Sequence, residues 1–500
     1  MPIAFNNIPS TTRTPGVFTE IDNSRALQGL SVNPHKVLII GQKTSAGSVD
    51  VETLQKITST TVAHGYFGID SILGRMCKTF KDANPNTDLY AIALSVTGGV
   101  KATGDIKFSI ALSHAAGAVS TNNELVNLMV GGIAAPFTLT SGWSVADVNS
   151  AAIDAVNAKD DMPVLASTNA ASALTFTAVQ SGTLGNGLDI RFNYYDGQSN
   201  PTCFGDSATI TDMAGGSVDP DITDAWAVVE NTQFHYMVNP YGDATNLAAF
   251  HDELEERFGP MIDKQGLGVM AKEDSLSNLL SFGDGENSAF ITTIGDYDSP
   301  TPKELWASNL SAVLAFYLNQ DPARPLHTLA LKGVLPPPLV SQFTQTERNL
   351  LLFDGISTWV QNANGDVAIE RMITMYQTNT AGGEDVSYLN VNTLATLSEI
   401  RYQYNLRMMT RFIIPRFKLA DDTYPIQPGQ VIAQPKTIKS EIIALFAELR
   451  DAGYIENLDD FADNLIVERN SSDRDRVDVL LPPDLINQFR IMASVIQFIL

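Results

Sequence analysis

The sequence predicts a multidomain protein of mixed α/β and α+β class, with an α/β core, an inserted β-rich domain, an α+β C-terminal domain and extended strand arms at both ends. Its 500 residues, 44% of them hydrophobic and 18% charged, are globular in composition and too many for one ordinary domain. Buried strands alternate with amphipathic helices in two separate stretches, which is typical of α/β structure. The stretch between them is rich in Gly, Ser, Thr, Ala and Asn and carries short alternating runs.

These patterns give five expected parts. They are an N-terminal extended linker arm (1–35), an α/β core domain (36–96 plus 216–335), an inserted β-rich domain (97–215), a C-terminal α+β assembly domain (336–488) and a C-terminal strand arm (489–500).

The N-terminal arm lacks a helical repeat and contains four prolines, which favours an extended chain over a packed element. Residues 16–22 alternate within it, so Val17, Thr19 and Ile21 share one face and Phe18, Glu20 and Asp22 share the other. This pattern predicts a strand that has no obvious local partner.

The core domain opens on a continuous apolar run at 36–41, which is typical of a fully buried parallel strand. A similar strand is expected at 89–95, and the helical character of 53–80 between them completes a βαβ unit. After the insertion we expect strands at 234–238, 266–271 and 289–294, with amphipathic helices between them.

One predicted helix of the core carries clear N-terminal capping signals. Thr301, Pro302 and Glu304 supply a capping residue, a proline at the first helical position and an acid three residues after the cap. An apolar run follows at once, from Leu305 to Tyr317.

The insertion is predicted to hold strands at 106–112, 125–130, 173–179 and 188–194 and one helix at 144–158. The tripeptide Gly185-Asn186-Gly187 lacks the third glycine and the strand-to-helix context of a dinucleotide-binding site. It is therefore interpreted as a turn.

The three prolines at 336–338 mark the start of the C-terminal domain. Beyond them we expect a hairpin around 367–373, a helix at 392–413 that Pro415 stops, and a helix at 439–452 that Gly453 ends. The stretch 477–500 is predicted to form two strands around Pro482-Pro483 and to finish on an apolar strand. Such a strand needs a sheet edge to receive it, and that edge could belong to another subunit.

Charge and cysteine content exclude several function classes. A net charge of −24 argues against a nucleic-acid partner, because binding phosphates needs clustered Lys and Arg. Cys77 and Cys203 are far apart, so they support neither a disulfide framework nor a zinc ribbon and are expected to be reduced, buried thiols. No secretory leader and no apolar run long enough for a membrane span is found, which predicts a soluble protein folded in the cytoplasm and no membrane partner.

A search for chemistry gives no catalytic, cofactor or metal residues. His64-Gly65 resembles a catalytic His-Gly pair, but no nucleophile segment accompanies it. The acidic run after His251 is expected to form the solvent-exposed face of a helix. The other face of this helix is expected to be core and carries Leu247, Phe250, Leu254 and Phe258. No HExxH pair or EF-hand loop is present. A soluble α/β hydrolase with an inserted β-domain is kept as the alternative.

Three segments together resemble the tail sheath family of contractile phages, especially Mu-like sheaths. They are TPGVFTEIDNSRA (14–26), TLGNGLDIRFNYY (183–195) and RVDVLLPPDLINQFRIMASVIQFIL (476–500). The resemblance implies a structural subunit, without cofactor or nucleotide, that forms hexameric rings stacked into a helical sleeve around an inner tail tube. The sleeve would contract on a signal from the baseplate and drive the tube through a cell envelope.

The same resemblance implies partners, a location and contact residues. The partners are further copies of the chain, the inner tube protein, and baseplate and tail terminator proteins. The location is the virion tail, assembled in the host bacterial cytoplasm; a phage and a phage-tail-like bacteriocin both remain open. The residues expected to link subunits are Val17, Phe18, Thr19, Glu20, Ile21, Ala493, Val495, Ile496, Gln497, Phe498 and Ile499.

A basic group is the candidate contact with the inner tube. It comprises Arg401, Arg407, Arg411, Arg416 and Lys418, and no acidic residue interrupts the stretch 401–420 in this acidic chain. Arg407 and Arg411 are four residues apart and share a helix face. The alternative interpretation is an ordinary solvated or ion-paired face.

Overall fold

The structure is a computed structural model that describes residues 15–17, 19, 29–108, 124–140, 143–169, 173–201, 208–427 and 429–499. The chain divides into two compact units. The larger unit holds Pro34–Ser398 and Asn487–Leu500, and the smaller unit holds Met1–Asn33 and Glu399–Ile486.

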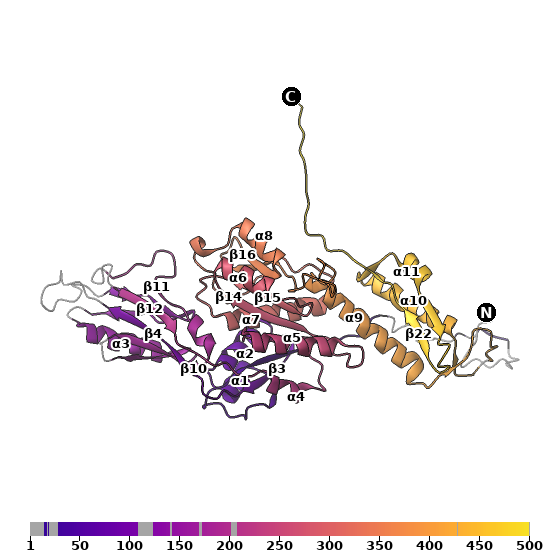
Figure 1. The fold of residues 1–500 in the computed structure, drawn as a ribbon, viewed down its shortest axis with the longest axis horizontal. Helices are drawn as coiled ribbons and strands as arrows, with labels where there is room; N and C mark the ends of the chain where they lie inside the picture. The colour runs from indigo at the N-terminus through magenta and orange to yellow at the C-terminus, as the bar shows by residue number, and fades with distance from the viewer. Residues whose placement is uncertain are drawn as a thin grey trace. The chain divides into compact units, whose positions relative to one another are not determined.

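The larger unit is built on an eight-stranded mixed sheet with the order β17-β16-β15-β14-β13-β1-β3-β2 (Figure 1). Its six inner strands run parallel, while β2 and β17 join the two edges in the antiparallel direction. The strands are β1 (Lys36–Gln42), β2 (Leu54–Ile57), β3 (Asp88–Leu94), β13 (Tyr236–Val238), β14 (Leu267–Glu273), β15 (Ile291–Asp296), β16 (Ile356–Gln361) and β17 (Val367–Arg371).

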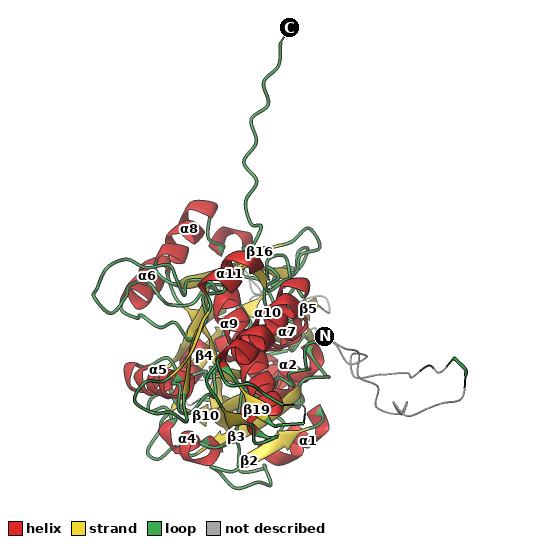
Figure 2. Ribbon diagram, turned by 90° about the vertical axis from the view of Figure 1, so that its right-hand side faces the viewer, coloured by secondary structure: helices red, strands yellow, loops and turns green. Residues whose placement is uncertain are grey.

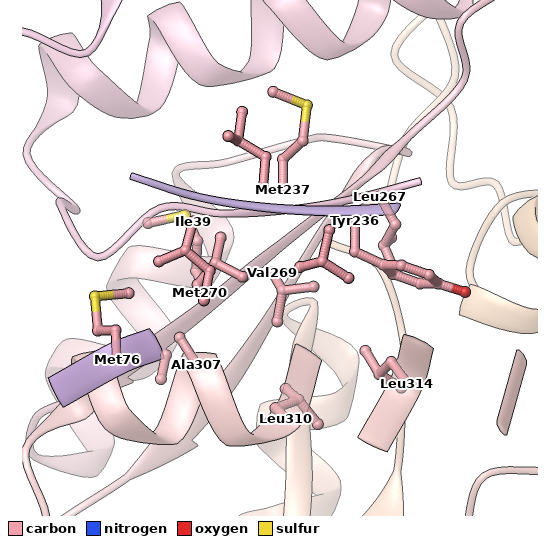
Figure 3. Close-up of a cluster of buried hydrophobic side chains, with 14 of the residues drawn as sticks. Ile39, Met76, Tyr236, Met237, Leu267, Val269, Met270, Ala307, Leu310 and Leu314 are labelled. Carbon is pink, nitrogen blue, oxygen red and sulfur yellow. The ribbon is translucent and has the colours of Figure 1, made fainter. Parts of the chain in front are cut away.

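Helices cover this sheet (Figure 2). They are α1 (Thr60–Phe67), α2 (Ile72–Ala83), α4 (Thr223–Val229), α5 (Ala244–Phe258), α6 (Leu276–Asp284), α7 (Lys303–Gln320), the short 3-10 helix η2 (Leu339–Ser341) and α8 (Gln345–Phe353). Most of α7 is buried, which is typical of a central helix packed on several sides. Figure 3 shows Ala307, Leu310 and Leu314 of α7 on the same side of the sheet as Met76 of α2.

The insertion has its own hydrophobic core, which includes Ile106, Phe176 and Val148. A four-stranded antiparallel sheet in the order β12-β4-β10-β9 packs with α3, and two smaller sheets, β11-β6-β7 and β5-β8, lie beside it. The elements are β4 (Lys101–Phe108), β5 (Glu124–Val126), β6 (Leu128–Val130), β7 (Ile133–Ala134), β8 (Phe137–Leu139), α3 (Val145–Asn157), β9 (Val164–Thr168), β10 (Leu174–Ser181), the 3-10 helix η1 (Thr183–Gly187), β11 (Ile190–Phe192) and β12 (Ala208–Ala214).

The smaller unit packs around α10, whose Phe446 stacks on Phe461 of α11 with ring centroids 3.9 Å apart. Three two-stranded sheets complete it: β18-β19, β20-β23 and β21-β22. Its elements are the C-terminal part of α9 (Val391–Met408), the π-helix η3 (Met409–Ile413), β18 (Lys418–Leu419), β19 (Ile432–Ala433), α10 (Pro435–Asp451), β20 (Ile455–Glu456), α11 (Leu458–Asn464), β21 (Ile466–Arg469), β22 (Val477–Leu480) and β23 (Asp484–Leu485).

The mixed α/β class predicted from the sequence is confirmed at the level of one large mixed sheet with several small antiparallel sheets. The buried strands expected at 36–41 and 89–95 are β1 and β3, and they pair in parallel as predicted. The helix expected at 439–452 is α10, and Gly453 follows it with a φ of 81°, as a C-terminal glycine should. Cys77 is buried as expected, whereas Cys203 lies outside the described residues.

The helical character expected for 53–80 is confirmed in α1 and α2, although β2 occupies the start of this stretch; Gly68 with a φ of 91° ends α1, and Ser71 caps α2. Two local predictions are wrong. Thr301 does not cap α7; its Oγ1 accepts a hydrogen bond from the backbone N–H of Leu335 at 2.9 Å, and Pro302 takes the cap position. The expected turn at 185–187 lies inside the 3-10 helix η1.

Candidate assembly site

The first candidate surface is the small sheet β21-β22. Val467 lies directly opposite Val479, and both pack against the core of the smaller unit. On the other face Ile466 lies opposite Leu480, and these side chains are 50% and 58% exposed. Within the described residues this sheet has only two strands, so each strand keeps an outer edge without a strand partner. Open edges of this kind are templates for pairing with another chain.

The second candidate surface is the tail, residues 487–499. It is extended and belongs to no helix or strand of the described chain (Figure 1). Its large apolar side chains are exposed: Phe489, Ile491, Met492, Val495, Ile496, Phe498 and Ile499, the last to 99%. Ala493 and Gln497 are exposed as well, so every linkage residue predicted in this arm is open to solvent in the single chain.

Exposed apolar side chains in this number indicate a surface that another molecule covers. Fully burying one side chain of this size contributes roughly 1.5–3 kcal/mol. A polar contact lies at the start of the tail, where Arg490 donates to Asn390 Oδ1 at 2.6 Å.

The N-terminal linkage residues are described only in part. Val17 is 97% exposed and Thr19 is exposed, whereas Phe18, Glu20 and Ile21 lie outside the described residues.

The predicted basic group lies along the end of α9, η3 and β18, and the structure divides it. Arg407 reaches across to α10, where it contacts Glu441 at 3.0 Å and Glu448 at 2.5 Å. Burial lowers the pKa of Arg407, but hydrogen bonds from its guanidinium to Glu448 and Glu441 outweigh this effect and raise it. Arg411 shares Glu441 at 3.3 Å while its side chain stays 60% exposed.

The remaining members of the group differ in exposure. Arg401 is half-buried on α9, whereas Arg416 and Lys418 are exposed beyond η3. Arg416 also has a φ of 59°, which is uncommon for a bulky residue. The helix face shared by Arg407 and Arg411 is thus an ion-paired face toward α10, while the exposed cations lie at its end.

Exposed apolar residues lie next to these cations in the chain, and they were not identified from the sequence as contact residues. Ile413 and Ile414 are 62% and 64% exposed, and Met409 and Phe417 are also exposed. The apolar run at 412–414 could have indicated an exposed contact surface, but it was interpreted as the end of a helix. The exposed surface at the end of η3 is therefore mixed apolar and basic.

The motifs tested for chemistry lie in structural positions. His64 is on α1, and burial lowers its pKa. The α5 face with Leu247, Phe250 and Leu254 is buried core, as predicted, and Phe258 packs partly buried against it. Among the described residues, no group of three or more His, Cys, Asp or Glu side chains could hold a metal ion. In the same ranges, no helix is long and apolar enough to cross a membrane.

Comparison with known families matches two consecutive models over residues 215–499. Residues 215–375 match the phage tail sheath protein central domain, and residues 384–499 match the phage tail sheath C-terminal domain. The chain is also 39% identical over 502 residues to the Mu-like prophage FluMu tail sheath protein of Haemophilus influenzae, and the match covers 100% of both chains.

Solved structures give more distant matches. A sheath tail protein from Listeria innocua is 12% identical, with a TM-score of 0.49, over 92% of this chain and 94% of that one. The helical sheath of the anti-feeding prophage in its contracted state is 9% identical, with a TM-score of 0.47, over 98% of this chain and 99% of that one.

Proposed function

The chain belongs to the phage tail sheath family, Mu-like prophage branch, and from this premise we propose that its copies form hexameric rings that stack around an inner tail tube and contract to drive the tube through a cell envelope. Members of this family are structural subunits of contractile tails and not enzymes. Membership therefore excludes the alternative of a soluble α/β hydrolase.

The observation that carries the proposal is the coexistence of an unpaired apolar tail and an open sheet in one chain. We assign the tail of one subunit to the edge of β21-β22 in a neighbour, and the N-terminal arm with Val17 and Thr19 to an edge of the same kind of sheet. A heterologous contact that does not close on itself generates a helical polymer. Main-chain pairing can hold such a polymer together while the globular bodies reorient.

The side-chain pattern of the tail fits a strand with both faces covered. Residues 491, 493, 495, 497 and 499 would lie on one face, and residues 492, 494, 496 and 498 on the other. Both rows contain large apolar side chains. Beside β22, one row would continue the buried side with Val479 and the other would extend the exposed side with Leu480.

For the inner tube we propose the mixed surface at the end of η3. Ile413 and Ile414 supply apolar contact area, while Arg411, Arg416 and Lys418 supply positive charge. Arg401 and Arg407 then act behind this surface, since both are half-buried. The facing surface of the tube should be acidic, because complementary charges orient and speed association.

The driving force of contraction in this proposal is the free-energy difference between two packings of the same subunits, held behind a kinetic barrier that the baseplate releases. The extended arms act as hinges between neighbouring bodies. We keep the limits proposed from the sequence for the two arms and the inserted domain, but we place the start of the C-terminal domain near residue 399 instead of 336, because β16 and β17 belong to the sheet of the core. In this proposal the tail terminator protein closes the far end of the sleeve.

Electron microscopy of the purified full-length protein tests the proposal directly. Rings or sleeves support it. Dispersed monomers at every concentration and salt condition, also in the presence of the inner tube protein, would refute it.

A further inference from the structure

A buried ion pair lies where the insertion meets the core domain. Arg75 of α2 and Glu304 in the first turn of α7 approach to 3.4 Å, and they are only 4% and 1% exposed. Gln180 of β10 comes from the insertion and borders the same space, with Gly185 of η1 beside it. These elements belong to the larger unit.

Several polar atoms of the ion pair and of Gln180 have no protein partner in the described part of the chain. These atoms are buried: Nε and Nη1 of Arg75, Oε2 of Glu304 and Nε2 of Gln180. Buried polar atoms in folded proteins are almost always hydrogen-bonded, either to protein or to ordered water. Three donors and one acceptor without a protein partner therefore belong to residues that line one hollow, which Asp70 also lines.

A small hollow separates these groups. The space open to the centre of a water molecule is about 10 Å³, and its apolar walls are Ile72, Pro163, Leu184 and Leu188. A volume of about one water-sized sphere is enough for a single water molecule. Such a water needs two to four polar partners, and the hollow offers them.

We infer that this hollow binds one ordered water molecule that bridges the core ion pair to the insertion. The water accepts hydrogen bonds from the guanidinium of Arg75 and from Nε2 of Gln180, and it donates one to Oε2 of Glu304. Its remaining hydrogen has no assigned acceptor, which leaves the water with three bonds, the typical number for a buried water.

The position of Gln180 makes this water part of a mechanical joint. Its Oε1 accepts from the backbone N–H of Ile72, the first residue of α2, at 2.5 Å. First-turn amides of a helix have no partner within the helix, so Gln180 satisfies one of them from outside. One side chain of the insertion is thus fixed both to the start of α2 and, through the water, to the Arg75–Glu304 pair. The insertion and the core domain are thus linked at this point.

A high-resolution map of the full-length protein, as subunit or polymer, is the direct test. We expect a density peak within hydrogen-bond distance of Arg75, Gln180 and Glu304. Two results would overturn the inference. One is an empty hollow in a map that shows other buried waters; the other is direct pairing of Gln180 Nε2 with Glu304.

A charge-exchange experiment tests the same joint in solution. Gln180→Glu keeps the acceptor for the Ile72 amide but removes the donor and places a second carboxylate at the hollow. We expect it to lower the thermal midpoint by about 1–3 °C. Adding Glu304→Gln restores one amide and one carboxylate around the water, so the double variant should recover most of that loss.

The control variant is Gln55→Met in β2, a part-buried glutamine outside the joint, which should not couple to Glu304→Gln. Hydrogen exchange of the first-turn amides of α2 gives a second readout. These amides should exchange at least several-fold faster in Gln180→Met, which removes the cap and the bridge together. Additive losses in the double variant would show that Gln180 and Glu304 share no water.

Discussion

Glu273 and Asp296 lie directly opposite each other at the carboxyl ends of the adjacent parallel strands β14 and β15. Burial, together with the charge of Asp296, raises the pKa of Glu273 to about 8. Burial also raises the pKa of Asp296 to about 7, and neither of its carboxylate oxygens has a hydrogen-bond partner among the described residues. The charged groups that act on this pair are Asp189, Arg191, Asp298, Lys303 and Glu304.

This pair predicts an unusual pH dependence of stability. Unfolded carboxyl groups lose their protons near pH 4, whereas these two keep theirs in the folded state to about pH 7–8. The folded state therefore binds more protons in this window, and its stability falls as the pH rises from about 4 to about 8. Glu273→Gln should remove part of that slope and stabilise the protein at pH 8 by on the order of 3 kcal/mol.

Denaturant unfolding between pH 4 and pH 9 measures the effect. The control is Glu230→Gln at an exposed position after α4, which should leave the slope unchanged. Equal slopes for wild type and Glu273→Gln would contradict the prediction.

Sequence patterns predicted the parts of this fold that depend on neighbouring residues. Continuous apolar runs identified β1 and β3, and Gly453 marked the end of α10, because burial on both faces and a positive φ leave local signatures. Contacts between residues that are distant in the sequence left no such local signature. Glu304 was expected only as the acid three residues after the cap of its own helix, but its side chain pairs with Arg75, 229 positions away.

The candidate site shows the same division. The apolar tail was predictable, because its composition is a local property of the sequence. The ion pairs of Arg407 were not assignable to Glu441 and Glu448 from the sequence, since they depend on how α9 and α10 pack. Exposure of Ile413 and Ile414 likewise follows from packing and not from the apolar run itself.

Removing either arm should separate folding from assembly. Deletion of residues 1–25 or of 493–500 is expected to leave a folded, soluble subunit that forms no ordered sleeves. For the second deletion the reason is that residues 493–499 are exposed and lie outside the hydrophobic cores of the chain. Size-exclusion chromatography with electron microscopy measures the outcome, and Met261→Ser, which removes a 94% exposed apolar side chain elsewhere, is the control. Normal polymers from both truncations would rule out the linkage role.

Proline substitution should identify the receiving edge of β22. The backbone N–H of Asn470 donates to the carbonyl of Arg476, so these two residues form a hydrogen-bonded pair of the antiparallel ladder. Because hydrogen-bonded and non-hydrogen-bonded pairs alternate, the amide of Asp478 points toward β21 and that of Val479 points away from it. Val479→Pro removes an outward donor and some of the side-chain packing on the core, so it should abolish sleeves while lowering the thermal midpoint less than the loss of a ladder hydrogen bond would. Asp478→Pro is the matched variant and should lower the midpoint clearly. Intact sleeves in Val479→Pro would assign the tail to another edge.

Arg407→Glu should act on stability and not selectively on assembly. The new carboxylate would face Glu441 and Glu448, and both lose their hydrogen bonds to the guanidinium. Because the side chains are only 17% and 25% exposed, we expect a loss of about 2 kcal/mol. Thermal unfolding measures it, with Arg450→Glu at an exposed end of α10 as the control. An unchanged midpoint would contradict the ion-pair geometry.

Arg416→Glu combined with Lys418→Glu should weaken assembly on the inner tube and leave stability nearly unchanged. Both side chains are exposed and make no salt bridge within the described residues, so their reversal should change the free energy of unfolding by less than about 1 kcal/mol. If they face an acidic tube, reversal places like charges together and weakens co-assembly at least tenfold, most strongly at low salt. Co-sedimentation with the inner tube protein across a salt series measures this, and Lys159→Glu on the insertion, exposed and equally charged, is the matched control. Co-assembly that is unchanged at every salt concentration would remove this surface as the tube contact, whereas a loss that high salt abolishes would assign it to complementary charge rather than to Ile413 and Ile414.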